Sequence, residues 1–266
     1  MKQTMILAAG LGTRLKPLTE TMPKALVSVQ GRPLLDILVR RLQQFGYDRF
    51  VINIHHFAQQ IRDYVAQQDY APLVHFSDET TQLLETGGGL KHARQLFHDD
   101  EPILIHNVDI LDNVDFGWFA RQHEADEDAV LLVSRRSTKR YLLFDSAMRL
   151  MGWTNIETGE VKSPFPWLRE SEFTVDEDLK VTVQPNSQLS ILNCQLNAYA
   201  FSGIHSFSPR LFPLMDRFPE RFSIIDFYLS VCHHAHIVGV PKDDLRLLDV
   251  GKLDTLDQAE KFISNI

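Results

Sequence analysis

The sequence has little cysteine and no long apolar stretch. Cys194 and Cys232 are the only two cysteines among 266 residues, so we expect no disulfide framework and a reducing, cytoplasmic location. The apolar run near the N-terminus stops at Gly10 after a single lysine, which is too short for a signal peptide. No stretch approaches the length that spans a bilayer. These features predict a cytoplasmic protein without a membrane partner.

Positive charge is also scarce. The chain has 27 Lys and Arg against 35 Asp and Glu, which gives a formal net charge of -8. A surface that binds nucleic acid needs a net basic face, so nucleic acid is not an expected partner. The phosphates of a small substrate would have to be neutralised by cations placed locally.

Motifs of several enzyme classes are missing. The chain has no Gly-x-Ser-x-Gly sequence, the usual nucleophile turn of hydrolases. The histidines of residues 233–236 lack the spacing and the nearby cysteines of a zinc site. A dehydrogenase would need a third glycine where Leu15 stands, and an acidic residue where residues 29–32 read Val-Gln-Gly-Arg. No Gly-Lys-Ser/Thr follows the first glycines, so a Walker A loop is not expected either.

A loop rich in glycine and cations follows the first apolar segment. Gly10 and Gly12 allow positive φ and leave N–H groups free to bind phosphate oxygens. Arg14 and Lys24 add two positive charges, which suits chemistry in which negative charge builds on phosphorus and leaves as pyrophosphate. The predicted nucleotide-binding residues of this segment are Leu7, Ala8, Ala9, Gly10, Gly12, Thr13 and Arg14.

The ordered sequence of residues 7–19, followed by Met-Pro-Lys-Ala-Leu at residues 22–26, resembles the signature of the sugar-1-phosphate nucleotidyltransferases, also called nucleoside-diphosphate-sugar pyrophosphorylases. The resemblance implies an enzyme of the EC 2.7.7 type that converts an NTP and a sugar 1-phosphate into an NDP-sugar and pyrophosphate. It also implies catalytic roles for two residues. Arg14 would stabilise the leaving pyrophosphate, and Lys24 would neutralise the α-phosphate and the sugar phosphate.

Alternating strand-like and helix-like segments predict an α/β fold with a doubly wound, mostly parallel, Rossmann-like sheet. Strands are expected at residues 50–54, 73–76 and 103–106, and helices at 34–45, 59–66 and 90–97, the last beginning after three glycines. We expect a single domain over residues 1–266. Its nucleotide-binding half is 1–133, an inserted β-rich sugar-binding subdomain or lid is 134–201, and 202–266 returns to the core. Short strands are expected in the insert at 141–144, 150–153 and 181–183.

Two aspartates follow strongly apolar segments. Asp109 and Asp249 are both expected to project from the carboxyl edge of the sheet, and two carboxylates with phosphate oxygens suit Mg²⁺. Either aspartate alone could equally be a turn former. In the family that the chain resembles, aspartates of these two motifs hold the metal between the two substrates. The resemblance therefore implies a Mg²⁺-dependent enzyme with Asp109 and Asp249 as metal ligands and catalytic residues.

Residues 85–89, Glu-Thr-Gly-Gly-Gly, resemble the N-acetylmuramate-1-phosphate uridylyltransferase branch of this family, which serves nucleotide-sugar biosynthesis for the cell wall. Mannose-1-phosphate guanylyltransferases and glucose-1-phosphate thymidylyltransferases carry variants of the same loop, so these activities stay open. Gln82, Gly87 and Gly88 are the predicted base-binding residues. For Gln82, exposed turn polarity is an equally good explanation.

The sugar site departs from the family pattern. Val108 stands where the family has a glycine, and no Glu-Lys pair occurs near Asn155. Lys162 or the basic residues 135–140 could supply the missing charge, although a basic run is usually a solvated face. The predicted sugar-binding residues are Asn155, Gly203 and Asp226. Because of these departures, a non-catalytic nucleotide-sugar sensor stays open as an alternative. The protein is expected to be a monomer or a small homo-oligomer.

Overall fold

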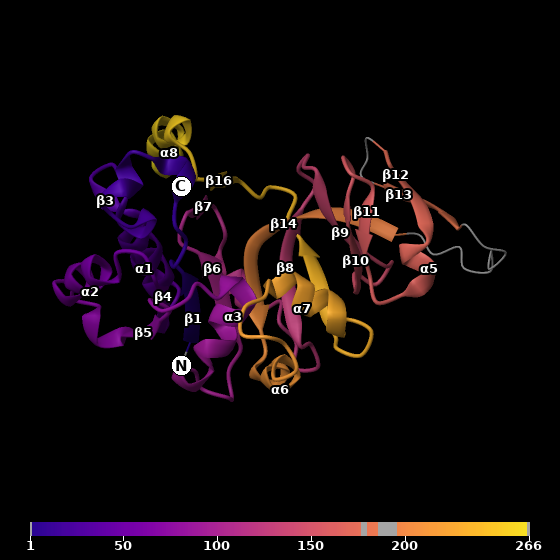
Figure 1. The fold of residues 1–266 in the computed structure, drawn as a ribbon, viewed down its shortest axis with the longest axis horizontal. Coiled ribbons are helices and arrows are strands. Elements are labelled where there is room, and N and C mark those ends of the chain that lie inside the picture. The colour runs from indigo at the N-terminus through magenta and orange to yellow at the C-terminus, as the bar shows by residue number, and fades with distance from the viewer. Residues whose placement is uncertain (1, 177–179, 186–195, 265–266) are drawn as a thin grey trace.

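A mixed sheet runs through the molecule (Figure 1). The computed structural model describes residues 2–176, 180–185 and 196–264, and Cys194 lies outside them. Within these ranges the twelve-stranded sheet has the order β11-β10-β9-β14-β6-β1-β4-β5, and β8, β12, β13 and β15 join it beside this path. Two small sheets pair β2 with β3 and β7 with β16.

The strands are β1 (Lys2–Leu7), β2 (Ser28–Val29), β3 (Arg32–Pro33), β4 (Tyr47–Ile54), β5 (Val74–Asp78), β6 (Ile103–Asn107), β7 (Ile110–Asp112), β8 (Ala129–Ser134), β9 (Arg140–Phe144), β10 (Leu150–Asn155), β11 (Glu160–Lys162), β12 (Ser171–Val175), β13 (Lys180–Pro185), β14 (Leu196–Phe207), β15 (Ile237–Pro241) and β16 (Leu247–Asp249). The α-helices are α1 (Leu34–Gln44), α2 (Ala58–Ala66), α3 (Glu85–His92), α4 (Phe116–Ala120), α5 (Pro166–Arg169), α6 (Phe212–Met215), α7 (Ile224–Val231) and α8 (Leu256–Ile263).

The parallel core of the sheet carries helices on both faces. Strand β1 lies between β4 and β6 and runs parallel to both, and β5 continues parallel to β4. Because neighbouring side chains of a strand point to opposite faces, Ile6 packs in one core with residues of α1 and α2. Met5 packs in the other core with residues of α3 and α7. This arrangement confirms the predicted α/β class and the doubly wound core, and the sheet as a whole is mixed.

The long strand β14 extends the sheet into a β-rich end. Its C-terminal half pairs antiparallel with β6 and its N-terminal half pairs antiparallel with β9. Strands β9 to β13 and the short helix α5 therefore lie at the end of the molecule opposite α1 and α2 (Figure 1). The strands predicted at 141–144, 150–153 and 181–183 are confirmed.

The predicted helix at 90–97 is wrong in its position. Helix α3 begins at Glu85 and ends at His92, so the three glycines lie inside it. Close packing explains their presence there: a Cβ at Gly87 would lie 2.5 Å from the Phe222 ring, and one at Gly88 would lie 2.1 Å from a carbonyl oxygen. Tertiary contacts have overridden the low helix propensity of glycine.

The C-terminal part of the chain returns to the first strands. In the two-stranded sheet of β16 and β7, Asp249 pairs with Ile110, and the Val250 N–H donates to the Asp109 carbonyl at 2.8 Å. The predicted aspartates are thus brought together by the backbone.

No helix in the described part of the chain is both long and apolar enough to cross a membrane.

Candidate active site

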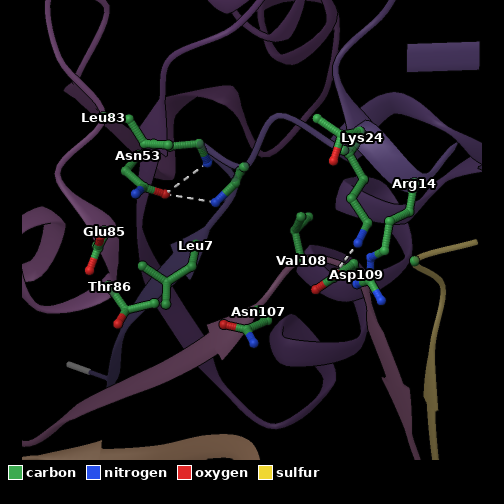
Figure 2. Close-up of a pocket in the computed structure, with 16 residues that line it drawn as sticks. Leu7, Arg14, Lys24, Asn53, Leu83, Glu85, Thr86, Asn107, Val108 and Asp109 are labelled. Atoms are coloured by element: carbon green, nitrogen blue, oxygen red, sulfur yellow. Dashed lines mark hydrogen bonds and ion pairs between the residues drawn. The ribbon is translucent and has the colours of Figure 1, made fainter. Parts of the chain in front are cut away.

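A cavity of about 310 Å³ lies where β1 and β6 end (Figure 2). We call it the first cavity. Its walls come from the glycine-rich loop after β1, the start of α3, the loop after β6 and the residues after β16. It is lined by Leu7, Ala8, Ala9, Gly10, Gly12, Thr13, Arg14, Lys24, Asn53, Leu83, Glu85, Thr86, Asn107, Val108, Asp109 and Gly251. All seven predicted nucleotide-binding residues of the loop are among them.

The glycine-rich loop is held in a fixed conformation. Gly12 has φ +62°, and a Cβ there would lie 2.8 Å from the Thr19 side chain. The Thr19 hydroxyl donates to the Gly12 carbonyl at 2.8 Å. At Gly10 an added Cβ would meet nothing within 4 Å, so the backbone here borders open space. The loop thus presents an ordered, uncovered backbone to the first cavity.

The two predicted cations and the two predicted metal ligands form one cluster. The Lys24 ammonium pairs with Asp109 and lies 3.8 Å from an oxygen of Asp249. Arg14 Nη2 lies 3.4 Å from the other oxygen of Asp249. Lys24 is nearly buried, with its side chain 9% exposed, and charge interactions are stronger where water is excluded.

The absence of a side chain at Gly251 leaves space for this cluster. A Cβ at this position would lie 2.6 Å from Asp249 Oδ1 and 2.7 Å from Arg14 Nη2. A side chain there would push the carboxylate and the guanidinium apart. The role of Gly251 was not predicted from the sequence, although it follows Asp249 by two residues.

Asp109 and Asp249 are the residues of this cluster that could hold a magnesium ion together with substrate oxygens. No three His, Cys, Asp or Glu side chains of the described ranges gather as a metal site of protein ligands alone would require. Mg²⁺ is usually bound by one or two carboxylates together with substrate phosphates and waters. Both Asp109 and Asp249 have an oxygen directed toward one cation, the Lys24 ammonium. Their oxygens are therefore placed to contact a positive charge.

A buried hydrogen-bonded pair, Asn53 and Glu79, ties together two walls of the first cavity. Asn53 Oδ1 accepts from the N–H groups of Ala8 and Ala9 at 2.7 and 3.3 Å. Asn53 Nδ2 donates to Glu79 Oε1 at 2.7 Å, and the other Glu79 oxygen accepts from the Leu84 N–H at 3.0 Å. Burial raises the pKa of Glu79, and the hydrogen bonds from Asn53 and Leu84 act against that rise. The pair connects the glycine-rich loop to the segment before α3.

This pair was not predicted from the sequence. The available signal was two polar residues at the ends of neighbouring parallel strands: Asn53 lies in β4, and Glu79 follows β5. Asn53 lies 45 positions from Ala8 and 26 from Glu79, so no local pattern shows these bonds, and only the bond from Leu84 to Glu79 is local.

The residues predicted to bind the base do not line the first cavity, unlike the residues of the glycine-rich loop. Gly87 and Gly88 do not line the first cavity, and their N–H groups donate to the Phe222 carbonyl at 2.9 and 3.1 Å. Gln82 is exposed outside the lining. Leu83, Glu85 and Thr86 form this wall instead, on the side of the cavity away from Lys24 (Figure 2).

The wall opposite Lys24 contacts Arg221 and the start of α7. Glu85 has φ +63°, a conformation that costs a residue with a side chain about 1–2 kcal/mol, and its carboxylate pairs with Arg221 at 2.8 Å. Thr86 Oγ1 accepts from the Ile224 N–H at the start of α7, at 3.0 Å. These contacts link the wall to Arg221 and to the start of α7.

A second cavity of about 480 Å³ lies between β9, β10, β11 and the start of α7. It contains Asp226, one of the three predicted sugar-binding residues. Its lining residues are Arg136, Thr138, Arg140, Leu142, Trp153, Glu160, Lys162, Phe201, Ser223, Ile225 and Asp226. Lys162, one of the candidates for the missing charge, donates to Asp226 at 3.1 Å and lies 5.4 Å from the Trp153 ring centroid.

The other two predicted sugar-binding residues line neither cavity. The Asn155 side chain accepts from the Glu157 N–H at 3.0 Å and thereby closes a turn. Gly203 has φ +82°, and a Cβ there would lie 3.0 Å from the Asn107 side chain. Val108, which replaces the family glycine, is buried beside Asp109, and its N–H donates to the Leu7 carbonyl at 3.1 Å.

Comparisons with known proteins show what the chain is similar to. Residues 3–141 match the family model described as nucleotidyl transferase. The N-acetylmuramate alpha-1-phosphate uridylyltransferase of Caulobacter vibrioides is 43% identical over 111 residues, which are 41% of this chain and 46% of that protein. The protein of the same name from Neisseria meningitidis is 40% identical over 115 residues, 43% of this chain and 49% of that protein. The chain thus spans about half the length of the curated relatives it matches.

Solved structures share the fold. A putative glucose-1-phosphate thymidylyltransferase from Bacillus anthracis superposes with a TM-score of 0.73 and 14% identity, covering 100% of this chain and 96% of that one. The inositol-1-phosphate CTP transferase from T. maritima superposes with a TM-score of 0.69 and 14% identity, covering 100% and 98%. At this identity the likeness establishes the fold alone.

Proposed function

This chain belongs to the nucleotidyl transferase family, and from that premise we propose that it transfers a uridylyl group from UTP to N-acetylmuramic acid 1-phosphate, releasing pyrophosphate. The observation that carries the proposal is the cluster of Arg14, Lys24, Asp109 and Asp249 beside the phosphate-binding loop. The choice of base and sugar is supported by the two uridylyltransferase relatives.

In the proposed reaction, an oxygen of the sugar phosphate attacks the α-phosphorus of UTP. The bond from that phosphorus to the bridging oxygen breaks, and pyrophosphate leaves with the electron pair. The N–H groups of the glycine-rich loop would hold the phosphates in line. No proton has to be taken from the attacking oxygen, because it is already ionised in a phosphate ester.

The charges of the cluster match the charge that develops. Arg14 would stabilise the pyrophosphate as it leaves, and nearly buried Lys24 would neutralise the α-phosphate and the sugar phosphate. Asp109 and Asp249 would hold Mg²⁺, which would supply further positive charge beside the phosphates. The presence of all four residues in one cluster favours catalysis over a non-catalytic sensor.

A panel of four NTPs against several sugar 1-phosphates, read by pyrophosphate release, tests the proposal. We expect UTP to exceed GTP in kcat/KM by at least about tenfold, because a purine would have to displace the wall at Leu83 and Thr86. Preferred use of GTP with mannose 1-phosphate, or of dTTP with glucose 1-phosphate, would reassign the substrates. Tight binding of a nucleotide sugar with no turnover of any pair would favour a sensor.

Weakening the Asn53–Glu79 pair should affect binding more than chemistry. We expect Glu79→Gln to raise KM for the nucleotide about tenfold with kcat within about threefold, because the amide must turn a donor toward Asn53 or Leu84 and loosen the loop. Steady-state kinetics would measure the split. The neighbouring exposed Asp78→Asn change is the matched control and should alter neither constant. A fall in kcat with KM unchanged would contradict this role.

A further inference from the structure

The second cavity has an unequal distribution of charge. Lys162 is matched by two carboxylates, since its ammonium lies 3.1 Å from Asp226 and 4.0 Å from Glu160. Arg136 donates to the Phe201 carbonyl at 3.0 Å, and no carboxylate of the described ranges pairs with Arg136 or Arg140. The lining therefore carries one net positive charge, and two of its guanidinium groups have no anionic partner among the residues that the structure describes.

The second cavity adjoins the first through the start of α7. Thr86 lines the first cavity and accepts a hydrogen bond from the Ile224 N–H at 3.0 Å. The residues on either side of Ile224, Ser223 and Ile225, line the second cavity. The start of α7 therefore connects the walls of the two cavities, as one substrate with its phosphate in the first and its sugar in the second would require.

The two guanidinium groups are not needed for the reacting phosphate. That phosphate must bring an oxygen to about 3–3.5 Å from the α-phosphorus, which places it beside the loop, Lys24 and Asp109 of the first cavity. Arginine has a planar pair of donors that fits a carboxylate with two parallel hydrogen bonds. These two cations of the second cavity are thus available to a second anionic group on the sugar.

We propose that Arg136 and Arg140 select a sugar 1-phosphate that carries a carboxylate, and that they do so by pairing with that carboxylate in the second cavity. This inference rests on the proposed function. It explains how the site can recognise its acceptor without the family's Glu-Lys pair, because the arginines recognise the carboxylate of the sugar. The Trp153 ring, which lies under Lys162, supplies an apolar surface for the sugar itself.

The test compares two acceptors that differ in this one group. N-acetylmuramic acid 1-phosphate carries a lactyl carboxylate, and N-acetylglucosamine 1-phosphate is the same sugar without it. With UTP, we expect the unaltered protein to prefer the carboxylated acceptor. The double variant Arg136→Gln/Arg140→Gln should lower kcat/KM for that acceptor by at least about tenfold and leave the value for N-acetylglucosamine 1-phosphate within about twofold.

Lys139→Gln is the matched control. Lys139 lies next to Arg140, is 69% exposed, pairs with Glu157 and does not line the cavity, so both acceptors should be unaffected. An equal loss for the two acceptors would show that the arginines hold the phosphate and would overturn the proposal. Unchanged kinetics in the double variant, or a preference of the unaltered protein for the neutral sugar, would also overturn it.

Failure of the proposed function gives a different result. If the protein turns over neither acceptor with any NTP, equilibrium binding of N-acetylmuramic acid 1-phosphate to the unaltered protein and to the double variant still tests the arginines. A Kd at least about tenfold weaker in the variant, with N-acetylglucosamine 1-phosphate binding unchanged, supports the pairing. Equal affinities contradict it.

Discussion

Asp109→Asn and Asp249→Asn are each expected to lower kcat by about 10² or more at saturating Mg²⁺, because each removes one of the two carboxylates that would hold the ion. The effects should differ in their origin. Asp109 is the more buried carboxylate and pairs with Lys24, so its loss also leaves that ammonium without its strongest partner. Asp249 is more exposed and contacts both Arg14 and Lys24.

Pyrophosphate release measured over a range of Mg²⁺ concentrations would check this expectation. Circular dichroism of each variant would establish that the fold is retained. Asp69→Asn is a suitable control, since its carboxylate is 76% exposed and pairs with Arg40 on α1, and it should keep full activity. The metal assignment is wrong if either folded aspartate variant keeps near-parental turnover at saturating Mg²⁺.

Arg14→Ala is expected to lower kcat by about 10²–10³ while changing the Kd for UTP by less than about threefold. The guanidinium contacts Asp249, whereas Thr19 and Asn53 form the side-chain hydrogen bonds to the loop backbone. Ground-state phosphates would therefore keep their backbone donors, and the developing charge would lose its partner.

Separate measurement of Kd by calorimetry and of kcat by pyrophosphate release distinguishes the two effects. Lys16→Ala is the matched control: it removes a cation two residues away that is exposed and pairs with Glu20, and neither constant should change. A variant with parental kcat and a greatly weakened Kd would assign Arg14 to simple binding.

The parts of the site that were predictable from the sequence are those encoded by short, ordered motifs. Gly10, Gly12 and Arg14 follow a strand within a few residues, and Asp109 follows another, so local pattern and sheet topology together place them at one edge. The same reasoning located the parallel core. Asp249 was predictable because its strand is apolar and its motif is recognisable, even though its partners are distant in sequence.

The remaining features depend on tertiary contacts that no local pattern contains. The glycines of α3 look like a break in the chain until Phe222 is placed against Gly87. The second cavity combines β9, β10, β11 and α7, so its lining could not be read from any one segment. Arg136 and Arg140, which line this cavity, lie within a basic run that, in sequence, resembles an ordinary solvated face.

The pairing of β16 with β7 has a consequence for the time at which the protein becomes active during its synthesis. Arg14 and Asp249, which meet in the cluster, are separated by 235 positions. The strands that flank β1 come from residues 47–54 and 103–107, but Asp249 is added only after β16 has left the ribosome. Chains whose translation stops earlier would therefore carry the glycine-rich loop without the second carboxylate of the cluster.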